Sequence, residues 1–185
     1  MVQERKNAVT FQGGPLTLLG PELKAGDKAP DFKVVGTDLK PVTLASSQGK
    51  TRLLSVVPSI DTPVCDLQTK RFNQEASKLP ANVAVLTVSM DLPFAQQRWC
   101  GLAGADKVQM LSDYQDHSFG QAYGVLIKEL KLLSRAVFII DPDNKIQYVE
   151  VVKEITQHPD YDKALGVLKG KCCHDTKTNA GKCCG

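Results

Sequence analysis

The sequence lacks any long hydrophobic run. Its longest uninterrupted apolar segment covers residues 136–140, Ala-Val-Phe-Ile-Ile, whereas a membrane-spanning helix needs about 20 apolar residues. An excess of one charge is also missing, since 23 Lys and Arg stand against 20 Asp and Glu, a formal net charge of +3. The hydrophobic fraction of 42% is nevertheless sufficient for one buried core in a chain of 185 residues. We therefore expect a folded domain that does not enter a membrane.

A concentrated basic surface and a leader segment are absent as well. Neighbouring cations occur only as short pairs such as Lys70-Arg71, which are typical of a solvated helix face, whereas nucleic-acid-binding proteins usually present a concentrated basic face. Glu4, Arg5 and Lys6 are not followed by the apolar run that a secretory signal contains. We expect a cytoplasmic protein with no nucleic-acid partner.

Cysteine is sparse in the body of the chain. Cys65 and Cys100 stand alone there, no C-x-x-C motif occurs, and the other four cysteines crowd into the last 14 residues (Cys172, Cys173, Cys183 and Cys184). Isolated cysteines in a cytosolic chain are more often catalytic, redox-active or simply buried than part of a disulfide framework. Because the apolar pattern stops at Gly170, we expect one domain over residues 1–169 and a flexible, Cys-rich tail over residues 170–185.

Strand and helix patterns alternate through the body of the chain. Strands are predicted over residues 32–35, 42–44, 52–57, 83–89, 108–111, 135–140 and 146–152, and helices over residues 63–78, 94–100, 116–123 and 160–168. Two β-prone runs flank Gly13-Gly14, which predicts an N-terminal β-hairpin with these glycines in its turn. Near-continuous apolar strands between helices indicate an α/β fold, in which helices cover both faces of a mixed sheet.

The segment from Pro58 to Cys65 places a cysteine at the beginning of a helix. Thr62 is a favourable N-cap residue, and Pro63 suits the first helical position. Cys65 then occupies the third helical position, where unpaired backbone N–H groups and the helix dipole favour a thiolate over a thiol. Asp66 opposes this effect, so a cation from elsewhere in the chain is required. A buried, inert cysteine is the alternative interpretation.

Three segments, in this order along the chain, carry family motifs. Residues 58–65 contain P-x-x-x-T-x-x-C, the active-site pattern of peroxiredoxins. Residues 89–100 (Ser-Met-Asp-Leu-Pro-Phe-Ala-Gln-Gln-Arg-Trp-Cys) resemble a segment that carries a resolving cysteine, and residues 123–127 with 134–141 resemble a later core segment. Together, over roughly residues 5–168, the chain resembles the thiol peroxidase subfamily of atypical two-cysteine peroxiredoxins. This resemblance implies a thioredoxin-like fold. The N-terminal hairpin is a feature of the thiol peroxidase subfamily.

The resemblance also assigns roles to single residues. Cys65 matches the peroxidatic cysteine, Cys100 the resolving cysteine, and Arg135 the guanidinium that activates the thiolate. Thr62 matches the hydroxyl that contacts Cys65, and Pro58 matches the proline that shields the site, so that Pro58, Thr62 and Arg135 are the expected substrate-binding residues. The chemistry agrees, because arginine keeps its proton while it holds a thiolate and donates to a peroxide. The alternative for Arg135 is a surface cation at the end of a strand.

The implied reaction is a complete redox cycle. Cys65 reduces hydrogen peroxide or an organic hydroperoxide, becomes a sulfenic acid and forms an intramolecular disulfide with Cys100, which thioredoxin reduces. We expect no metal or organic cofactor, and we expect the protein to form a homodimer. The Cα atoms of a disulfide lie within about 7 Å. Because both cysteines fall in or beside predicted helices, we expect these helices to unwind locally during turnover. The alternative for Cys100 is a buried helix residue.

Two other interpretations use the cysteines differently. Cys65 and Arg71 fit C-x5-R, the phosphate loop of cysteine phosphatases, but the residues between them include no glycine and Asp66 would repel phosphate. The tail instead offers thiolates and an imidazole to a soft metal such as Zn²⁺ or Cu(I), although adjacent cysteine pairs lack the spacing of structural zinc sites (Cys172, Cys173, His174, Cys183 and Cys184). Metal binding or thiol buffering by the tail is therefore the alternative function.

Overall fold

A seven-stranded sheet forms the centre of the computed structural model, which describes residues 2–171. The strand order is β10-β9-β5-β6-β7-β3-β4, with β3 (Lys33–Gly36), β4 (Pro41–Thr43), β5 (Thr51–Val56), β6 (Val83–Ser89), β7 (Gln109–Ser112), β9 (Ala136–Ile140) and β10 (Ile146–Val151). The pairs β5–β6 and β6–β7 are parallel, and the other neighbours are antiparallel. The mixed sheet that the sequence predicts is confirmed.

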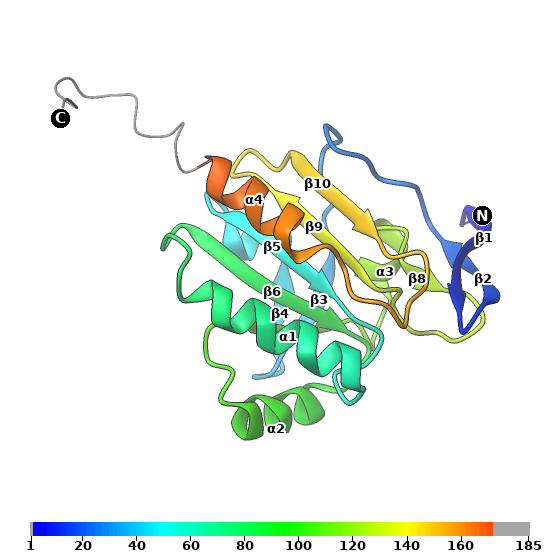
Figure 1. The fold of residues 1–185 in the computed structure, drawn as a ribbon, viewed down its shortest axis with the longest axis horizontal. Helices are drawn as coiled ribbons and strands as arrows, with labels where there is room; N and C mark the ends of the chain where they lie inside the picture. The colour runs from blue at the N-terminus through cyan, green and yellow to red at the C-terminus, as the bar shows by residue number, and fades with distance from the viewer. Residues whose placement is uncertain (1, 172–185) are drawn as a thin grey trace, which may run out of the picture.

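Helices lie on both faces of this sheet (Figure 1). They are α1 (Pro63–Ala76), α2 (Pro93–Ala103), α3 (Ser118–Ala122) and α4 (Tyr161–Lys171), with a short 3-10 helix η1 at Leu44–Ser47. The fully buried strand β9 shows how the layers meet. Val137 packs in the cluster that contains Phe72 of α1 and Leu165 of α4, whereas Phe138 packs in the cluster that contains Phe119 of α3. Because successive side chains of a strand point to opposite faces, a strand between two helical layers is apolar throughout.

A second, smaller sheet joins β1 (Glu4–Phe11), β2 (Gly14–Leu19) and β8 (Leu126–Ile127), all antiparallel. The predicted N-terminal hairpin is present, but the prediction of Gly13-Gly14 in its turn is wrong. Gly14 already pairs with Phe11 as the first residue of β2, and the turn consists of Gln12 and Gly13, with φ of +49° and +80°. Both central residues do have positive φ, as a two-residue hairpin turn requires. Strand register therefore decides which residues occupy the turn, and glycine content alone does not.

The other predicted strands and helices are present, with shifts at their ends, whereas β8 and the 3-10 helix η1 were not predicted. α2 runs on to Ala103, beyond its predicted end at Cys100, and α4 continues through Lys171. The candidate metal ligands of the tail lie outside the described residues (Cys172, Cys173, His174, Cys183 and Cys184). Between residues 2 and 171, no helix combines the length and the apolar character needed to cross a membrane.

Candidate active site

Cys65 lies in the first turn of α1, which follows the buried strand β5 after the loop of residues 57–62. Thr62 occupies the N-cap position with extended φ and ψ of −122° and 148°, and Pro63 is the first helical residue. Cys65 is therefore the third residue of the helix, as the sequence predicts, and its side chain has no exposed surface. The first backbone N–H groups of a helix have no partner within it, and together with the helix dipole they stabilise negative charge at this position.

The cation that the helix start requires is Arg135. This residue directly precedes β9 and is only 2% exposed, which excludes the alternative of a surface cation. Its Nη2 donates to Cys65 Sγ at 3.3 Å, its Nη1 to Gln68 Oε1 at 2.7 Å, and its Nε to the Ile155 carbonyl oxygen at 2.9 Å. All three guanidinium nitrogens are thus engaged, and the planar fork fixes where the positive charge meets the sulfur.

Gln68 is a site residue that the sequence interpretation missed. It lies one turn after Cys65 on the buried face of α1 and has no exposed surface. While its Oε1 accepts from Arg135, its Nε2 donates to Ser55 Oγ at 2.9 Å, so that β5, α1 and the guanidinium are linked in series. A polar residue three positions after the cysteine shares its helix face, and this spacing is the signal that could have identified it.

The carboxylate of Asp66, expected to disfavour a thiolate, is paired elsewhere. It accepts a hydrogen bond from Trp99 Nε1 at 3.0 Å and forms a salt bridge with Lys70, one turn further along α1, at 3.0 Å. An acidic residue in the first turn of a helix is itself favourable. The structure therefore compensates the charge of Asp66 with groups other than the sulfur of Cys65.

Thr62 and Pro58 lie at the mouth of the site. The Thr62 hydroxyl donates to the Ser59 carbonyl oxygen at 3.0 Å, and its oxygen accepts no hydrogen bond from the backbone N–H groups of α1, so Thr62 is the N-cap by position only. Its oxygen keeps lone pairs that can accept a further hydrogen bond. Pro58 is buried and lines the same pocket as Thr62. The contact of this hydroxyl with Cys65 and the shielding role of Pro58 stay predictions.

An apolar pocket of about 450 Å³ opens beside the guanidinium. Side chains from the N-terminal hairpin, the active-site loop, the segment before β9 and the segment after β10 line it (Phe11, Pro58, Ser59, Thr62, Pro63, Val64, Leu130, Leu132, Arg135, Ile155 and Thr156). Among the described residues that line it, Arg135 is the only charged one. A small reactive group can therefore meet the cation while an apolar remainder contacts the walls.

Cys100 lies in α2 and is half-buried, packed with Trp99 against the hydrophobic cluster that contains Cys65. Both cysteines are free thiols, and burial raises the pKa of the Cys100 thiol. The pairing of the two cysteines stays a prediction. Within residues 2–171, no group of three or more His, Cys, Asp and Glu residues is arranged to hold a metal ion.

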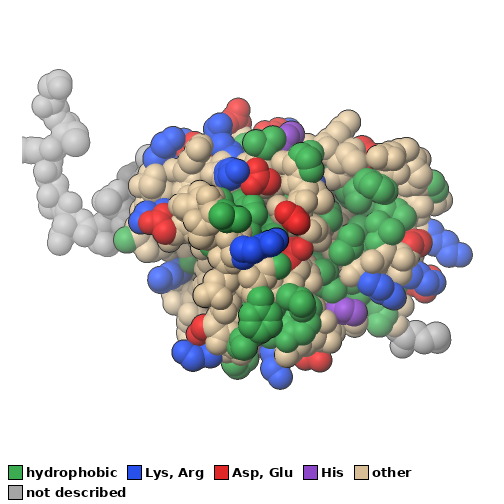
Figure 2. Space-filling model, turned by 90° about the horizontal axis from the view of Figure 1, so that it is seen from below, with side chains coloured by type: hydrophobic (Ala, Val, Ile, Leu, Met, Phe, Trp, Pro, Cys, Tyr) green, Lys and Arg blue, Asp and Glu red, His purple; other side chains and the backbone are tan. Residues whose placement is uncertain are grey.

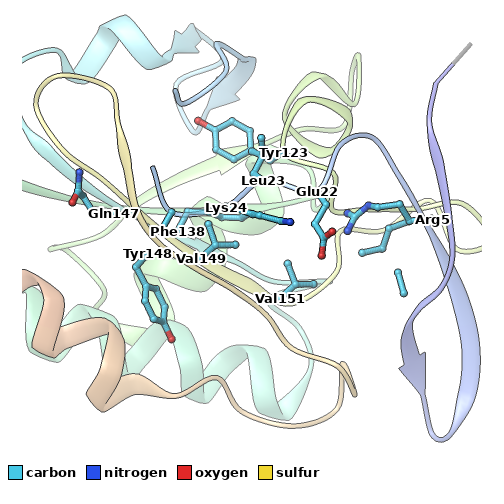
Figure 3. A pocket seen from close by; sticks show the side chains of 13 residues that line it. Arg5, Glu22, Leu23, Lys24, Tyr123, Phe138, Gln147, Tyr148, Val149 and Val151 are labelled. Carbon is cyan, nitrogen blue, oxygen red and sulfur yellow. The ribbon is translucent and has the colours of Figure 1, made fainter. Parts of the chain in front are cut away.

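A second cavity of about 460 Å³ lies between the N-terminal strands, the segment after β2 and the strands β9 and β10 (Figure 3). Among the described residues that line it, the charged ones are Arg5, Glu22 and Lys24, and none is a cysteine. Figure 3 shows the Glu22 carboxylate beside the Arg5 guanidinium, whose Nε donates to the Gly20 carbonyl oxygen at 3.2 Å.

The fold is a mixed sheet with helices on both faces. Its site is a cysteine at the start of a helix, and the sulfur accepts a hydrogen bond from a buried arginine. This combination defines a thiol-based redox protein of the thioredoxin-like class. The chain belongs to the Redoxin family, whose model matches residues 24–165. These findings confirm the predicted fold class and the family resemblance.

Individual relatives agree with this assignment. The chain is 60% identical over 162 residues to a thiol peroxidase of Halalkalibacterium halodurans, a match that covers 88% of this chain and 97% of that protein. It is 56% identical over 161 residues to a thiol peroxidase of Bacillus subtilis, with 87% and 96% covered. The crystal structure of a peroxiredoxin-like protein from Aquifex aeolicus matches with a TM-score of 0.83 and 42% identity, over 89% of this chain and 96% of that one.

Proposed function

We propose that this protein is a thiol-dependent peroxidase in which Cys65 reduces hydrogen peroxide and organic hydroperoxides. The observation that carries the proposal is the 3.3 Å hydrogen bond from Arg135 Nη2 to the buried Cys65 Sγ at the start of α1. This contact provides the sulfur with the positive charge that a thiolate nucleophile needs. Similarity to thiol peroxidases at 60% and 56% identity supports the same reaction and disfavours the alternative of a metal-binding or thiol-buffering tail.

The first chemical step oxidises the sulfur. The Cys65 thiolate attacks one peroxide oxygen, an S–O bond forms as the O–O bond breaks, and the departing oxygen takes up a proton and leaves as water or an alcohol. Negative charge moves from sulfur to the departing oxygen during this step. The Arg135 guanidinium lies where it can donate to both, and the Thr62 oxygen can accept the O–H of the peroxide. The apolar walls of the pocket suit a hydroperoxide with a hydrocarbon substituent.

The second step forms a disulfide between Cys65 and Cys100. The Cys100 sulfur attacks the sulfenic acid, an S–S bond forms, the S–O bond breaks, and the oxygen leaves as water. The two cysteines lie in different helices, and burial raises the pKa of Cys100. We therefore propose that α2 and the first turn of α1 unwind locally, which brings the sulfurs together and exposes Cys100 to water. Thioredoxin is the proposed reductant of the disulfide, and a cytoplasmic homodimer is the proposed state of the protein.

A peroxidase assay coupled to thioredoxin and its reductase tests the proposal. We expect Cys65→Ser to be inactive, and Cys100→Ser to reduce about one equivalent of peroxide and then stop. As a matched control, a variant with serine at all four tail cysteines should keep the activity. Mass spectrometry after one equivalent of peroxide should show Cys65 linked to Cys100. Sustained turnover by Cys65→Ser, or a disulfide that excludes Cys100, would overturn the proposal.

A further inference from the structure

One hydrogen bond connects the two cysteine-bearing helices at the residues beside the cysteines. Trp99, next to Cys100 in α2, donates from its indole Nε1 to Oδ1 of Asp66, next to Cys65 in α1, at 3.0 Å. The Trp99 ring also packs against the hydrophobic cluster that contains Cys65. Any movement that takes Cys100 out of α2 towards Cys65 must therefore displace Trp99 or break this bond.

The beginning of α2 is anchored separately. Asp91, two residues before the helix, accepts from Ser59 Oγ at 2.7 Å and from the Ile60 backbone N–H at 2.8 Å. Its own carbonyl oxygen accepts from the Ser112 hydroxyl at the end of β7. These bonds hold the segment before α2 to the active-site loop and to the sheet. The part of α2 that carries Trp99 and Cys100 lies at the other end of the helix.

The side chains that pack at that end of α2 are only partly buried: Trp99, Cys100 and Ala103 contact the hydrophobic cluster that contains Cys65. Pro93 and Gln96, near the start, are the buried residues of the helix, whereas Leu102, near its end, is 84% exposed. Figure 2 views the molecule from the side on which α2 lies in Figure 1, and hydrophobic side chains gather on this surface. Segments with few buried contacts open at low free energy, so a single hydrogen bond has a large effect on their opening.

We propose that the Asp66–Trp99 hydrogen bond is a latch that keeps Cys100 in α2 while Cys65 reacts with peroxide, and that its release sets the rate of disulfide formation. Asp66 and Trp99 are positioning residues, because they act through the cysteines beside them. The proposal rests on the proposed function, since it gives the latch a role in the Cys65–Cys100 step. A hydrogen bond to a charged group changes an opening equilibrium by about tenfold.

Conservative variants separate the latch from the other roles of these residues. Trp99→Phe keeps an aromatic ring and removes the N–H donor, and Asp66→Asn keeps an acceptor oxygen but loses the charge. Lys70→Gln is the matched control, since it removes the 3.0 Å salt bridge of Asp66 and leaves the Trp99 bond in place. If the hydrogen bond is a latch, the opening of α2 should increase strongly in Trp99→Phe, less in Asp66→Asn and not at all in Lys70→Gln.

Alkylation of Cys100 by iodoacetamide, followed by peptide mass spectrometry in the Cys65→Ser background, measures the opening of α2 without any peroxidase activity. We expect about tenfold faster labelling of Cys100 with Trp99→Phe or Asp66→Ala, and no further increase when the two are combined. Equal labelling rates with and without the latch, or effects of the two variants that add fully, would overturn the proposal.

A second measurement follows the reaction itself in the full chain with Cys65 present. A sulfenic acid that is not resolved reacts with a second peroxide to give sulfinic acid, so an open latch should lower the sulfinic acid formed per turnover by about tenfold. Unchanged sulfinic acid formation in Trp99→Phe would overturn the role in resolution. An active Cys65→Ser protein would instead overturn the proposed function, and the labelling result would still report whether Asp66 and Trp99 hold α2.

Discussion

Gly101→Ala should slow disulfide formation between Cys65 and Cys100 by about two- to fivefold. Gly101 lies inside α2 on an exposed position, and a Cβ at this residue would meet no atom within 4 Å. Alanine therefore fits without strain, and it is favoured over glycine in a helix by about 0.5–1 kcal/mol. Because about 1.4 kcal/mol corresponds to a tenfold change in an equilibrium constant, the unwound form of α2 becomes about two- to fivefold rarer. Disulfide formation that passes through this form slows by the same factor.

The assay uses the only tryptophan of the chain, Trp99. Stopped-flow fluorescence after one equivalent of peroxide follows the change around this side chain as α2 opens, and mass spectrometry quantifies sulfinic acid at Cys65. Gly166→Ala is a matched control, since Gly166 is also exposed, lies in the helix α4, and would place its Cβ in open space. Both substitutions should raise the melting temperature by about 1–4 °C. Only Gly101→Ala should slow the resolving step and increase the sulfinic acid.

The reasoning is refuted if Gly101→Ala stabilises the protein as Gly166→Ala does and yet leaves the resolving step unchanged. In that case α2 would stay helical during turnover, and Cys100 would reach Cys65 by a different movement. A slower reaction in both variants would equally contradict the reasoning, because it would place the limiting event in global rather than local opening.

The remaining predictions concern the charge at the sulfur and the state of Cys100. Arg135→Lys should slow the reaction of Cys65 with peroxide by about 100-fold, because an ammonium cannot reproduce the three directed contacts of the guanidinium; a loss below about threefold in stopped-flow kinetics would contradict this. Gln68→Met should slow the same step by about five- to tenfold through loss of the 2.7 Å acceptor for Arg135, whereas the exposed Gln74→Met should not. Burial raises the pKa of Cys100, so its thiol is protonated at neutral pH. In the Cys65→Ser variant, the rate of Cys100 alkylation should therefore keep rising at pH values at which free cysteine is already fully ionised. An alkylation midpoint equal to that of free cysteine would argue against this burial effect.

The sequence predicts most of the architecture because the signals involved are local. Thr62 and Pro63 mark the start of α1, so the helical position of Cys65 follows from its neighbours in the chain. Arg135 is different, since the contact with Cys65 joins residues 70 positions apart. Its own neighbourhood equally permits a surface cation, and only the family resemblance assigned it to the sulfur.

The missed interactions are those in which one polar residue satisfies another across two elements. Trp99 has the pattern of a packing residue and Asp66 that of an unfavourable charge beside Cys65, and neither pattern shows that the two side chains meet. Gln68 is similar, because its amide is explained only when Ser55 and Arg135 are placed on either side of it. Buried polar groups require partners, but a sequence does not state which distant group supplies them.

Cys65 and Cys100 have very different surroundings, because Cys65 is fully buried against Arg135 whereas Cys100 is half-buried in α2. This difference suits their proposed roles in the reaction. A buried guanidinium without partners is strongly unfavourable, so a movement of the first turn of α1 is tolerated only if Arg135 keeps other acceptors. The Ile155 carbonyl oxygen, outside α1, and Gln68, one turn further along it, provide them at 2.9 Å and 2.7 Å. If the first turn of α1 unwinds as we propose, Arg135 therefore keeps these two acceptors when Cys65 leaves it. Cys100 has no comparable contact with a buried charge, because the charged residue of its own helix, Arg98, is exposed.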